Sequence, residues 1–238
     1  MKITIVMPTY NEAENLPKMA ETLFALPLDD LNLLVVDDNS TDGTGIIADK
    51  LAEQFPGKLS VIHREGKLGL GSAYIHGFKH LLKGTSDVIG QMDADFSHPP
   101  EKIVKLVEAL KSCDVAVGSR YIPGGSLDEH WPAWRKGLST FANFYARTIL
   151  GLPIKDTTGA FRLIKREAML MLPLDRIRSN GYVFQVELAY LKHKIGLSFK
   201  EVPIHFKERE FGASKMSFGI QMEAALRVWS LLWQYRDL

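Results

Sequence analysis

Short apolar runs alternate with segments of helical periodicity along the first half of the chain. Strands are predicted at 2–7, 31–36, 59–63, 87–92 and 114–118, and helices at 44–55, 71–82 and 101–111. A further helix is predicted just after Asn11, with Glu14 in the capping-box position. Strands rich in Val and Ile that alternate with helices of this length predict parallel βαβ units with right-handed crossovers.

The second half of the chain has a less regular pattern. Strands are predicted at 160–164 and 198–202, and a helix at 183–194. Two longer amphipathic helices are predicted near 131–150 and 216–235, because apolar residues recur there at spacings of three and four. Their stripes are Trp131, Trp134, Leu138, Phe141, Tyr145 and Ile149, and Phe218, Met222, Leu226, Trp229 and Trp233. No repeat or linker interrupts the chain, which predicts a single domain over residues 1–238.

Composition narrows the class of protein. The 238 residues are 46% hydrophobic and 24% charged, which suits one compact domain and argues against intrinsic disorder. The single cysteine, Cys113, excludes a disulfide framework and a cysteine-based zinc site, and it fits a reducing compartment. No apolar run reaches the roughly 18 residues that span a bilayer, and acidic residues follow the start too early for a signal peptide. We therefore expect a soluble or membrane-peripheral protein.

Charge is distributed unevenly along the chain. Residues 1–119 hold 11 Lys and Arg against 17 Asp and Glu, whereas residues 120–238 hold 18 against 11. An acidic half that faces a basic half is expected where carboxylates hold a cation and basic groups hold an anion. An uneven solvated surface accounts equally well for the counts alone.

Two pairs of carboxylates follow predicted strands of the first half. Asp37 and Asp38 follow the strand at 31–36, and Asp93 and Asp95 follow the strand at 87–92. Ligands of open α/β sheets bind beyond the carboxyl ends of the strands, so these pairs are expected at a ligand site. Asp93 and Asp95 can share a hard divalent cation that completes its shell with water and phosphates. The alternative is a turn with solvated side chains.

Two other motifs are rejected on their details. Residues 38–49 match an EF-hand loop in part, but a strand precedes them and Asp49 replaces the bidentate Glu. The expected role of residues 41–44 is a turn and a helix cap, which leaves Asp37 or Asp38 to face a ligand. Gly69 and Gly71 resemble a dinucleotide fingerprint, but Tyr74 occupies the position of its third glycine.

Basic residues of the second half are candidates for anion binding. Arg120 closes the strand at 114–118 and is expected at the same edge as Asp93. Arg209 and Lys215 flank a short loop that could fold over bound phosphates, since guanidinium and ammonium groups suit phosphate oxygens. The aromatic stripes fit either a protein core or a helix in a membrane interface, where Arg135 would lie at the rim. No dense basic patch or motif indicates nucleic-acid binding.

These segments resemble family 2 glycosyltransferases of the GT-A fold. The segments are PTYNE at 8–12, VVDDNSTDGT at 35–44 and MDADFSHPP at 92–100. Later segments are similar to those of dolichol-phosphate (polyprenol-phosphate) mannose synthases: GSRY at 118–121, GG at 124–125, DTTG at 156–159, GY at 181–182, and residues 209–215. The resemblance runs in order through residues 3–215. It implies an α/β fold with a mostly parallel central sheet and flanking helices.

The resemblance implies transfer of mannose from GDP-mannose to a polyprenyl or dolichyl phosphate, with inversion at the sugar carbon. It implies nucleotide contacts by Pro8, Tyr10, Glu12, Val36 and Asp38. It implies that Asp93, Ala94 and Asp95 hold the metal (Mg²⁺ or Mn²⁺) and the diphosphate, with Asp93 and Asp95 as the catalytic pair. It implies phosphate binding by Arg120, Arg209 and Lys215, with Arg135 and Ser139 near the lipid phosphate. Some relatives carry a Gln ligand at the position of Ser97, where a water could replace it.

The expected chemistry needs no general base. A phosphate acceptor is already anionic at neutral pH, and metal and cations would neutralise charge on the departing diphosphate. Several relatives continue into transmembrane helices, so attachment at the cytoplasmic face is expected through the aromatic helices or a membrane-anchoring subunit. Two alternatives stay open: transfer of another sugar such as glucose, and a non-catalytic subunit that binds a nucleotide sugar.

Overall fold

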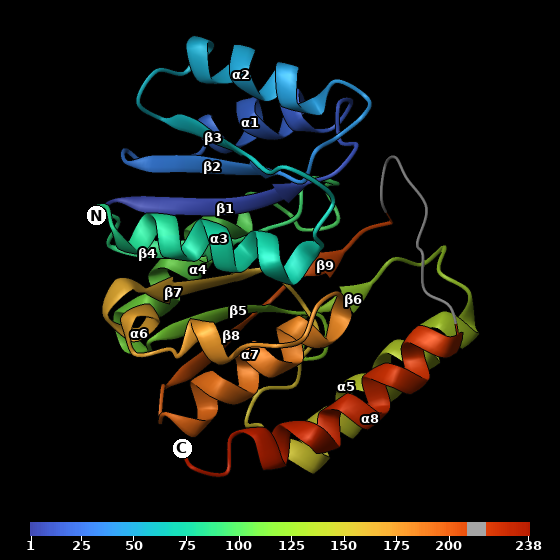
Figure 1. Ribbon diagram of the computed structural model, residues 1–238. Helices are drawn as coiled ribbons and strands as arrows, with labels where there is room; N and C mark the ends of the chain where they lie inside the picture. Colours follow the sequence, from blue (N-terminus) through green and yellow to red (C-terminus); the bar gives the residue numbers. More distant parts are fainter. Residues whose placement is uncertain (209–217) are drawn as a thin grey trace.

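The computed structural model describes residues 1–208 and 218–238. Within these residues a seven-stranded sheet has the order β3-β2-β1-β4-β7-β5-β8 (Figure 1). The strands are β1 (Ile3–Thr9), β2 (Leu31–Asp37), β3 (Leu59–His63), β4 (Val88–Gln91), β5 (Val115–Ser119), β7 (Arg162–Lys165) and β8 (Phe199–Pro203). Strand β7 runs antiparallel to both of its neighbours, and the other pairs are parallel. The predicted α/β class with a mostly parallel sheet is confirmed.

Helices cover both faces of the sheet (Figure 1). They are α1 (Leu16–Phe24), α2 (Thr44–Gln54), α3 (Leu70–Leu82), α4 (Lys102–Ala109), α5 (Ala133–Leu150), α6 (Arg166–Leu170), α7 (Tyr182–Lys194) and α8 (Phe218–Gln234). Two hydrophobic cores lie on opposite faces of the sheet, and alternate residues of β1 pack into one or the other. Ile5 and Met7 pack on the side of α1, α2 and α4, whereas Val6 packs on the side of α3 and α7.

Most predicted elements of the first half are confirmed, with one correction at the start of α1. The helix begins at Leu16, and Asn15 rather than Asn11 precedes it. Asn11 has a φ of 60°, which a helix cannot use, and its side-chain oxygen accepts the backbone N–H of Thr41 at 2.9 Å. Asn11 therefore joins two loops at one end of the sheet, a contact that spans 30 residues.

A small second sheet was not predicted. It pairs β6 (Ser126–Leu127) with β9 (His205–Phe206) in parallel. Strands of two residues lack a period that the sequence could show. This ribbon brings the segment before α5 next to the segment that follows β8.

Helices α5 and α8 lie side by side along one flank of the molecule (Figure 1). The Tyr145 hydroxyl donates to the Ala225 carbonyl at 3.2 Å and accepts the indole N–H of Trp229 at 2.9 Å. The buried side chains of α5 are Asn143, Ala146 and Leu150. The predicted stripe is therefore not the buried face of this helix. No helix in the described part of the chain is both long and apolar enough to cross a membrane.

Candidate active site

The carboxyl ends of β1, β2 and β4 meet at one edge of the sheet (Figure 1). The parallel register pairs Pro8 with Val36 and Thr9 with Asp37, and Asp93 follows β4 two residues after Gln91. The two carboxylate pairs, Asp37 with Asp38 and Asp93 with Asp95, are far apart in the sequence. They reach the same edge because β1 lies between β2 and β4 in the sheet. The predicted convergence on this edge is confirmed, and it is the place where such sheets bind ligands.

Asp95 is buried and held by its own turn. Its side chain accepts the Ser97 hydroxyl at 2.6 Å and the Ser97 backbone N–H at 3.1 Å, both on Oδ1. Phe96, between them, has a φ of 58°, in the left-handed region that side chains other than glycine rarely adopt. Ala94 is buried as well. The chain turns sharply here, which keeps the Asp95 carboxylate in one orientation.

Asp93 is more open, and residues from two other segments hold it. Its side chain is 29% exposed. The Tyr74 hydroxyl of α3 donates to Oδ1 at 3.1 Å, and the Asp93 backbone N–H donates to Nδ1 of His98 at 3.2 Å. His98 is buried against the ring of Phe161, with a centroid distance of 5.3 Å. Neither Tyr74 nor His98 was a predicted site residue, because their relation to Asp93 appears only in the fold.

Electrostatics keep these two partners uncharged. Burial raises the pKa of the Tyr74 hydroxyl well above its usual value, and the negative charge of Asp93 raises it further. Burial lowers the pKa of the His98 imidazole, although Asp93 and Asp95 pull it upward. Tyr74 therefore stays a proton donor, and a neutral His98 accepts on Nδ1.

Asp37 and Asp38 are both buried and hydrogen-bonded. Asp37 accepts the hydroxyls of Thr9 and Ser40 at 3.1 and 2.6 Å. Asp38 forms an ion pair with Arg64 at 2.5 Å and accepts the backbone N–H of Gly69 at 2.8 Å. In this state Asp38 orders the loop before α3. Its nucleotide contact remains a prediction, and Arg64 is a neighbour that the sequence did not indicate.

The other residues implied in nucleotide binding surround the loop after β1. Pro8 is partly exposed, and the ammonium of Lys67 lies 3.6 Å from the centroid of the Tyr10 ring. The Glu12 carboxylate accepts the Asn15 side chain at 2.7 Å. Val36 is fully buried, and its contact with a nucleotide remains a prediction.

Arg120 lies at the same edge as Asp93, as predicted. Its guanidinium forms a bidentate pair with Asp156 at 2.7 Å for each bond and donates to Thr158 at 2.8 Å. Burial alone would lower the pKa of Arg120, but the charge of Asp156 raises it above its usual value. Burial alone would raise the pKa of Asp156, and Arg120 holds it below its usual value. Arg120 therefore stays charged in a buried position.

The residues implied near the lipid phosphate lie at the start of α5. Arg135 stacks over the Trp131 ring at 3.7 Å and pairs with Glu208 at 2.8 Å. The hydroxyls of Ser139 and Tyr121 are hydrogen-bonded at 2.7 Å. Arg209 and Lys215 lie outside the described residues, so their phosphate contacts remain predictions.

Comparison with known proteins identifies the family. Residues 4–170 match the family described as Glycosyl transferase family 2. The chain belongs to this family. It is 44% identical over 226 residues to the polyprenol monophosphomannose synthase of Mycolicibacterium smegmatis, covering 94% of this chain and 84% of that protein. It is 43% identical over 241 residues to the undecaprenyl-phosphate mannosyltransferase of Micrococcus luteus, covering 100% and 98%.

Solved structures agree with the fold of this family 2 glycosyltransferase. A glucosyl-3-phosphoglycerate synthase from Mycobacterium tuberculosis, in complex with Mn²⁺, UDP and glucosyl-3-phosphoglycerate, has a TM-score of 0.63 at 18% identity. The match covers 98% of this chain and 79% of that one. A mycobacterial protein has a TM-score of 0.68 at 19% identity, with 98% and 74% covered. The expected GT-A fold is confirmed, and so is the resemblance to polyprenol-phosphate mannose synthases.

The donor set of the glycosyltransferase suits a cation that is only partly held by protein. No group of three or more His, Cys, Asp or Glu side chains in the described ranges could hold a metal ion. Mg²⁺ commonly binds through one or two carboxylates and completes its shell with water and substrate phosphates. Asp93 and Asp95, one partly exposed and one buried at the same turn, fit that mode rather than a closed protein cage.

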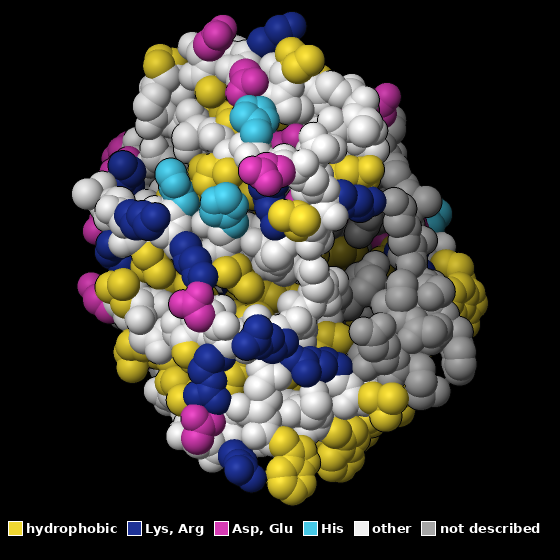
Figure 2. All heavy atoms as spheres, viewed as in Figure 1, with side chains coloured by type: hydrophobic (Ala, Val, Ile, Leu, Met, Phe, Trp, Pro, Cys, Tyr) yellow, Lys and Arg dark blue, Asp and Glu magenta, His cyan; other side chains and the backbone are white. Residues whose placement is uncertain are grey.

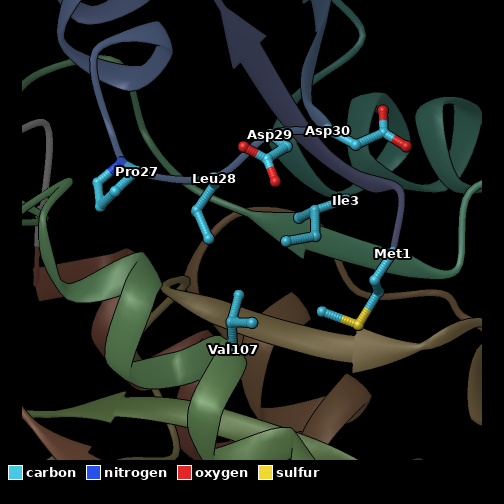
Figure 3. Close-up of a pocket in the computed structure, with 7 residues that line it drawn as sticks. All are labelled: Met1, Ile3, Pro27, Leu28, Asp29, Asp30 and Val107. Carbon is cyan, nitrogen blue, oxygen red and sulfur yellow. The ribbon is translucent and has the colours of Figure 1, made fainter.

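A hollow at the opposite edge of the sheet is separate from this site (Figure 3). Its lining residues are Met1, Ile3, Pro27, Leu28, Asp29, Asp30 and Val107. Ile3 begins β1, and Asp30 directly precedes β2, so the hollow lies at the amino ends of the strands. The hollow contains none of the residues that converge at the carboxyl edge.

Proposed function

We propose that this glycosyltransferase transfers mannose from GDP-mannose to the phosphate of a polyprenyl phosphate, with inversion at the sugar carbon. The observation that carries the proposal is the pair Asp93 and Asp95 at the carboxyl edge of a family 2 fold. The acceptor class is supported by two relatives, at 44% and 43% identity, whose names specify polyprenol or undecaprenyl phosphate and mannose.

The residues at the carboxyl edge have different proposed roles in the transfer of the sugar from the donor diphosphate to the acceptor phosphate. Asp93 and Asp95 would hold Mg²⁺ or Mn²⁺, which when bound stabilises negative charge on the leaving diphosphate. Tyr74 and the turn at Ser97 keep the two carboxylates in place. An acceptor phosphate is anionic at neutral pH, so no side chain has to remove its proton. None of the described carboxylates is therefore assigned as a general base.

Cationic side chains would bind the phosphates of donor and acceptor. Arg120 is fixed by Asp156 next to the acidic edge, and Arg135 is supported by the ring of Trp131. Arginine suits this role because its donors match phosphate oxygens in pairs. Arg209 and Lys215 complete the proposed set.

The flank formed by α5 and α8 is the proposed contact with a membrane surface. Its exposed apolar side chains are Trp134, Phe141, Phe144, Leu226, Trp229 and Trp233, with exposed fractions from 52% to 73%. Figure 2 shows hydrophobic side chains gathered at the lower right, where Figure 1 places α8, with Lys and Arg side chains beside them. Tryptophan with neighbouring basic groups suits the interface of an anionic bilayer. The proposed location is the cytoplasmic face, where a buried free cysteine such as Cys113 remains reduced.

The transfer itself is tested with radiolabelled GDP-mannose and a polyprenyl phosphate in detergent, with Mg²⁺ or Mn²⁺. We expect metal-dependent transfer of label into the organic phase, in a form that mild acid releases. Transfer of label from UDP-glucose but not from GDP-mannose would show that the transferred sugar is glucose rather than mannose. Binding of GDP-mannose without turnover, for both metals and several lipid phosphates, would indicate a non-catalytic subunit and contradict the proposal.

Membrane contact is tested by sedimentation with vesicles that contain anionic lipid. Replacing Trp229 and Trp233 by serine is expected to weaken vesicle binding about tenfold or more, because the membrane surface loses contact with two exposed indole rings. Leu170→Ser is the matched control, since Leu170 is 57% exposed on α6, away from the α5 and α8 pair. Equal binding of the double variant and the control would contradict the assigned surface and favour attachment through another subunit.

A further inference from the structure

Tyr74 makes a contact that neither the motif nor the family relation assigns. It lies in the second turn of α3, its side chain is fully buried, and its hydroxyl donates to Oδ1 of Asp93 at 3.1 Å. The hydroxyl therefore contacts Asp93, one of the two proposed metal ligands.

The ring of Tyr74 has little freedom to move. It stacks on Phe184 of α7 at a centroid distance of 5.8 Å and 5° between the planes, and on Phe78 at 5.8 Å and 26°. Two glycines allow α3 to pack this closely. A Cβ at Gly71 would meet the Phe184 ring at 2.9 Å, and a Cβ at Gly77 would meet the Val6 side chain at 2.5 Å. The hydroxyl is thus placed by packing from three elements.

The backbone of Asp93 is held as well. Its N–H donates to Nδ1 of His98 at 3.2 Å, and the His98 ring lies between Phe161 and Phe206 at centroid distances of 5.3 and 5.5 Å. His98 thus holds the backbone of Asp93, and Tyr74 contacts its side chain at Oδ1. Hydrogen bonds of this kind orient metal ligands in proteins, and their loss typically weakens metal binding.

We propose that Tyr74 is a positioning residue that sets the orientation of Asp93 for a divalent cation bound together with a nucleoside diphosphate. The inference rests on the proposed metal role of Asp93. Asp93 is only partly buried, so loss of the Tyr74 hydroxyl removes one of the contacts that orient its side chain. The cation would then lose one correctly oriented ligand, and the buried Asp95, held by its own turn, would remain.

A purely structural role for Tyr74 is the competing explanation, and a second tyrosine separates the two. Tyr235 is also fully buried and its hydroxyl donates to a carboxylate, Oε1 of Glu187, at 2.6 Å. It follows α8, and its ring packs edge-on against Tyr190 of α7 at a centroid distance of 6.4 Å. Tyr74→Phe and Tyr235→Phe therefore remove the same chemical group from equally buried sites.

The test measures binding of Mn²⁺ by calorimetry to the full chain in the presence of GDP, together with the thermal midpoint of unfolding. We expect Tyr74→Phe to weaken Mn²⁺ binding about tenfold or more, and Tyr235→Phe to leave it within a factor of two of wild type. Both variants are expected to lower the thermal midpoint, since each removes a hydrogen bond between a buried tyrosine hydroxyl and a carboxylate. In transfer assays the half-saturating Mn²⁺ concentration should rise for Tyr74→Phe alone.

Each outcome bears on a different assignment. If the wild type binds Mn²⁺ and Tyr74→Phe binds it with the same affinity, the positioning role of Tyr74 is overturned. The metal role of Asp93 would remain intact. Equal weakening in both variants would also overturn the positioning role, because a general loss of stability would then be the cause. If wild-type protein with GDP bound no Mn²⁺, the metal assignment of the proposed function would fail, and the inference with it.

Discussion

Two buried charges of opposite sign, Asp95 after β4 and Arg120 after β5, are held in different ways. Asp95 is held by Ser97, two residues further along the chain. Arg120 is held by Asp156, which is 36 residues away and reaches it from a separate loop. A charge held within one turn depends on local geometry, whereas a charge held across the fold depends on tertiary packing. The two sites are therefore expected to respond to mutation differently.

The largest effect is expected on stability, from breaking the Arg120–Asp156 ion pair. Asp156→Ala should lower the free energy of unfolding by about 3–5 kcal/mol, because it leaves the Arg120 guanidinium buried without a counter-charge. Denaturant titration followed by fluorescence measures the change. Asp49→Ala is the control: Asp49 pairs with His63 at an exposed site and should cost less than about 1 kcal/mol. Similar losses in the two variants would contradict the tertiary role of Asp156.

The same pair predicts a pH dependence. Arg120 holds the pKa of Asp156 below its usual value of 3.8, so the ionised carboxylate stabilises the folded state above that pH. This contribution is lost as the pH falls through the lowered pKa of the folded state. Unfolding free energy of the wild type should therefore decrease more steeply below pH 3.8 than that of Asp156→Ala, measured at matched ionic strength. Parallel curves would contradict the linkage.

A substitution in the turn after β4 is expected to lower transfer activity rather than stability. Asp95→Asn keeps the oxygen that accepts from Ser97 but removes the charge, so the fold should persist while transfer falls about a hundredfold. Initial rates at saturating GDP-mannose and Mn²⁺ provide the measurement, with circular dichroism as a check of folding. Asp29→Asn, an exposed carboxyl at the opposite edge of the sheet, is the control and should retain full activity. A wild-type rate in Asp95→Asn would remove Asp95 from the site.

The smallest effects are expected from two glycine substitutions that compare packing in the two halves of the chain. Gly77→Ala places a Cβ 2.5 Å from the Val6 side chain and should destabilise the fold by about 1–3 kcal/mol. Gly137→Ala meets no atom within 4 Å on α5 and should stabilise it by about 0.5–1 kcal/mol, because alanine favours the helix. Thermal unfolding measures both. Changes of the same sign would contradict the difference in packing.

The sequence predicted the elements of the first half well because each one carries a local signal. Strands such as Leu59–His63 and helices such as Leu70–Leu82 lie close to their predicted limits. The start of α1 was the exception. Asn11 has the residue type of a cap, but its side chain binds the Thr41 backbone, and that contact depends on the fold. A local pattern cannot distinguish these two uses of one amide.

The second half shows the limit of the same signals. The stripe on α5 includes Trp134 and Phe141, which are exposed, whereas Asn143 is buried and accepts the backbone N–H of Thr157 at 2.8 Å. Periodicity identifies a helix, but the partner helix and nearby loops select which face is covered. The antiparallel strand β7 likewise has no signal of direction, because an apolar run reads the same in either orientation.

For the candidate site, residue types and their spacing were enough to indicate the chemistry: two carboxylates after a buried strand, and a motif that places the chain in its family. Only the tertiary structure determined what holds those groups. Tyr74 reaches Asp93 across 19 residues, and Asp156 reaches Arg120 across 36. The physical reason is that residue type and spacing act within a turn or strand, whereas buried hydrogen bonds and ion pairs form between segments that only packing brings together.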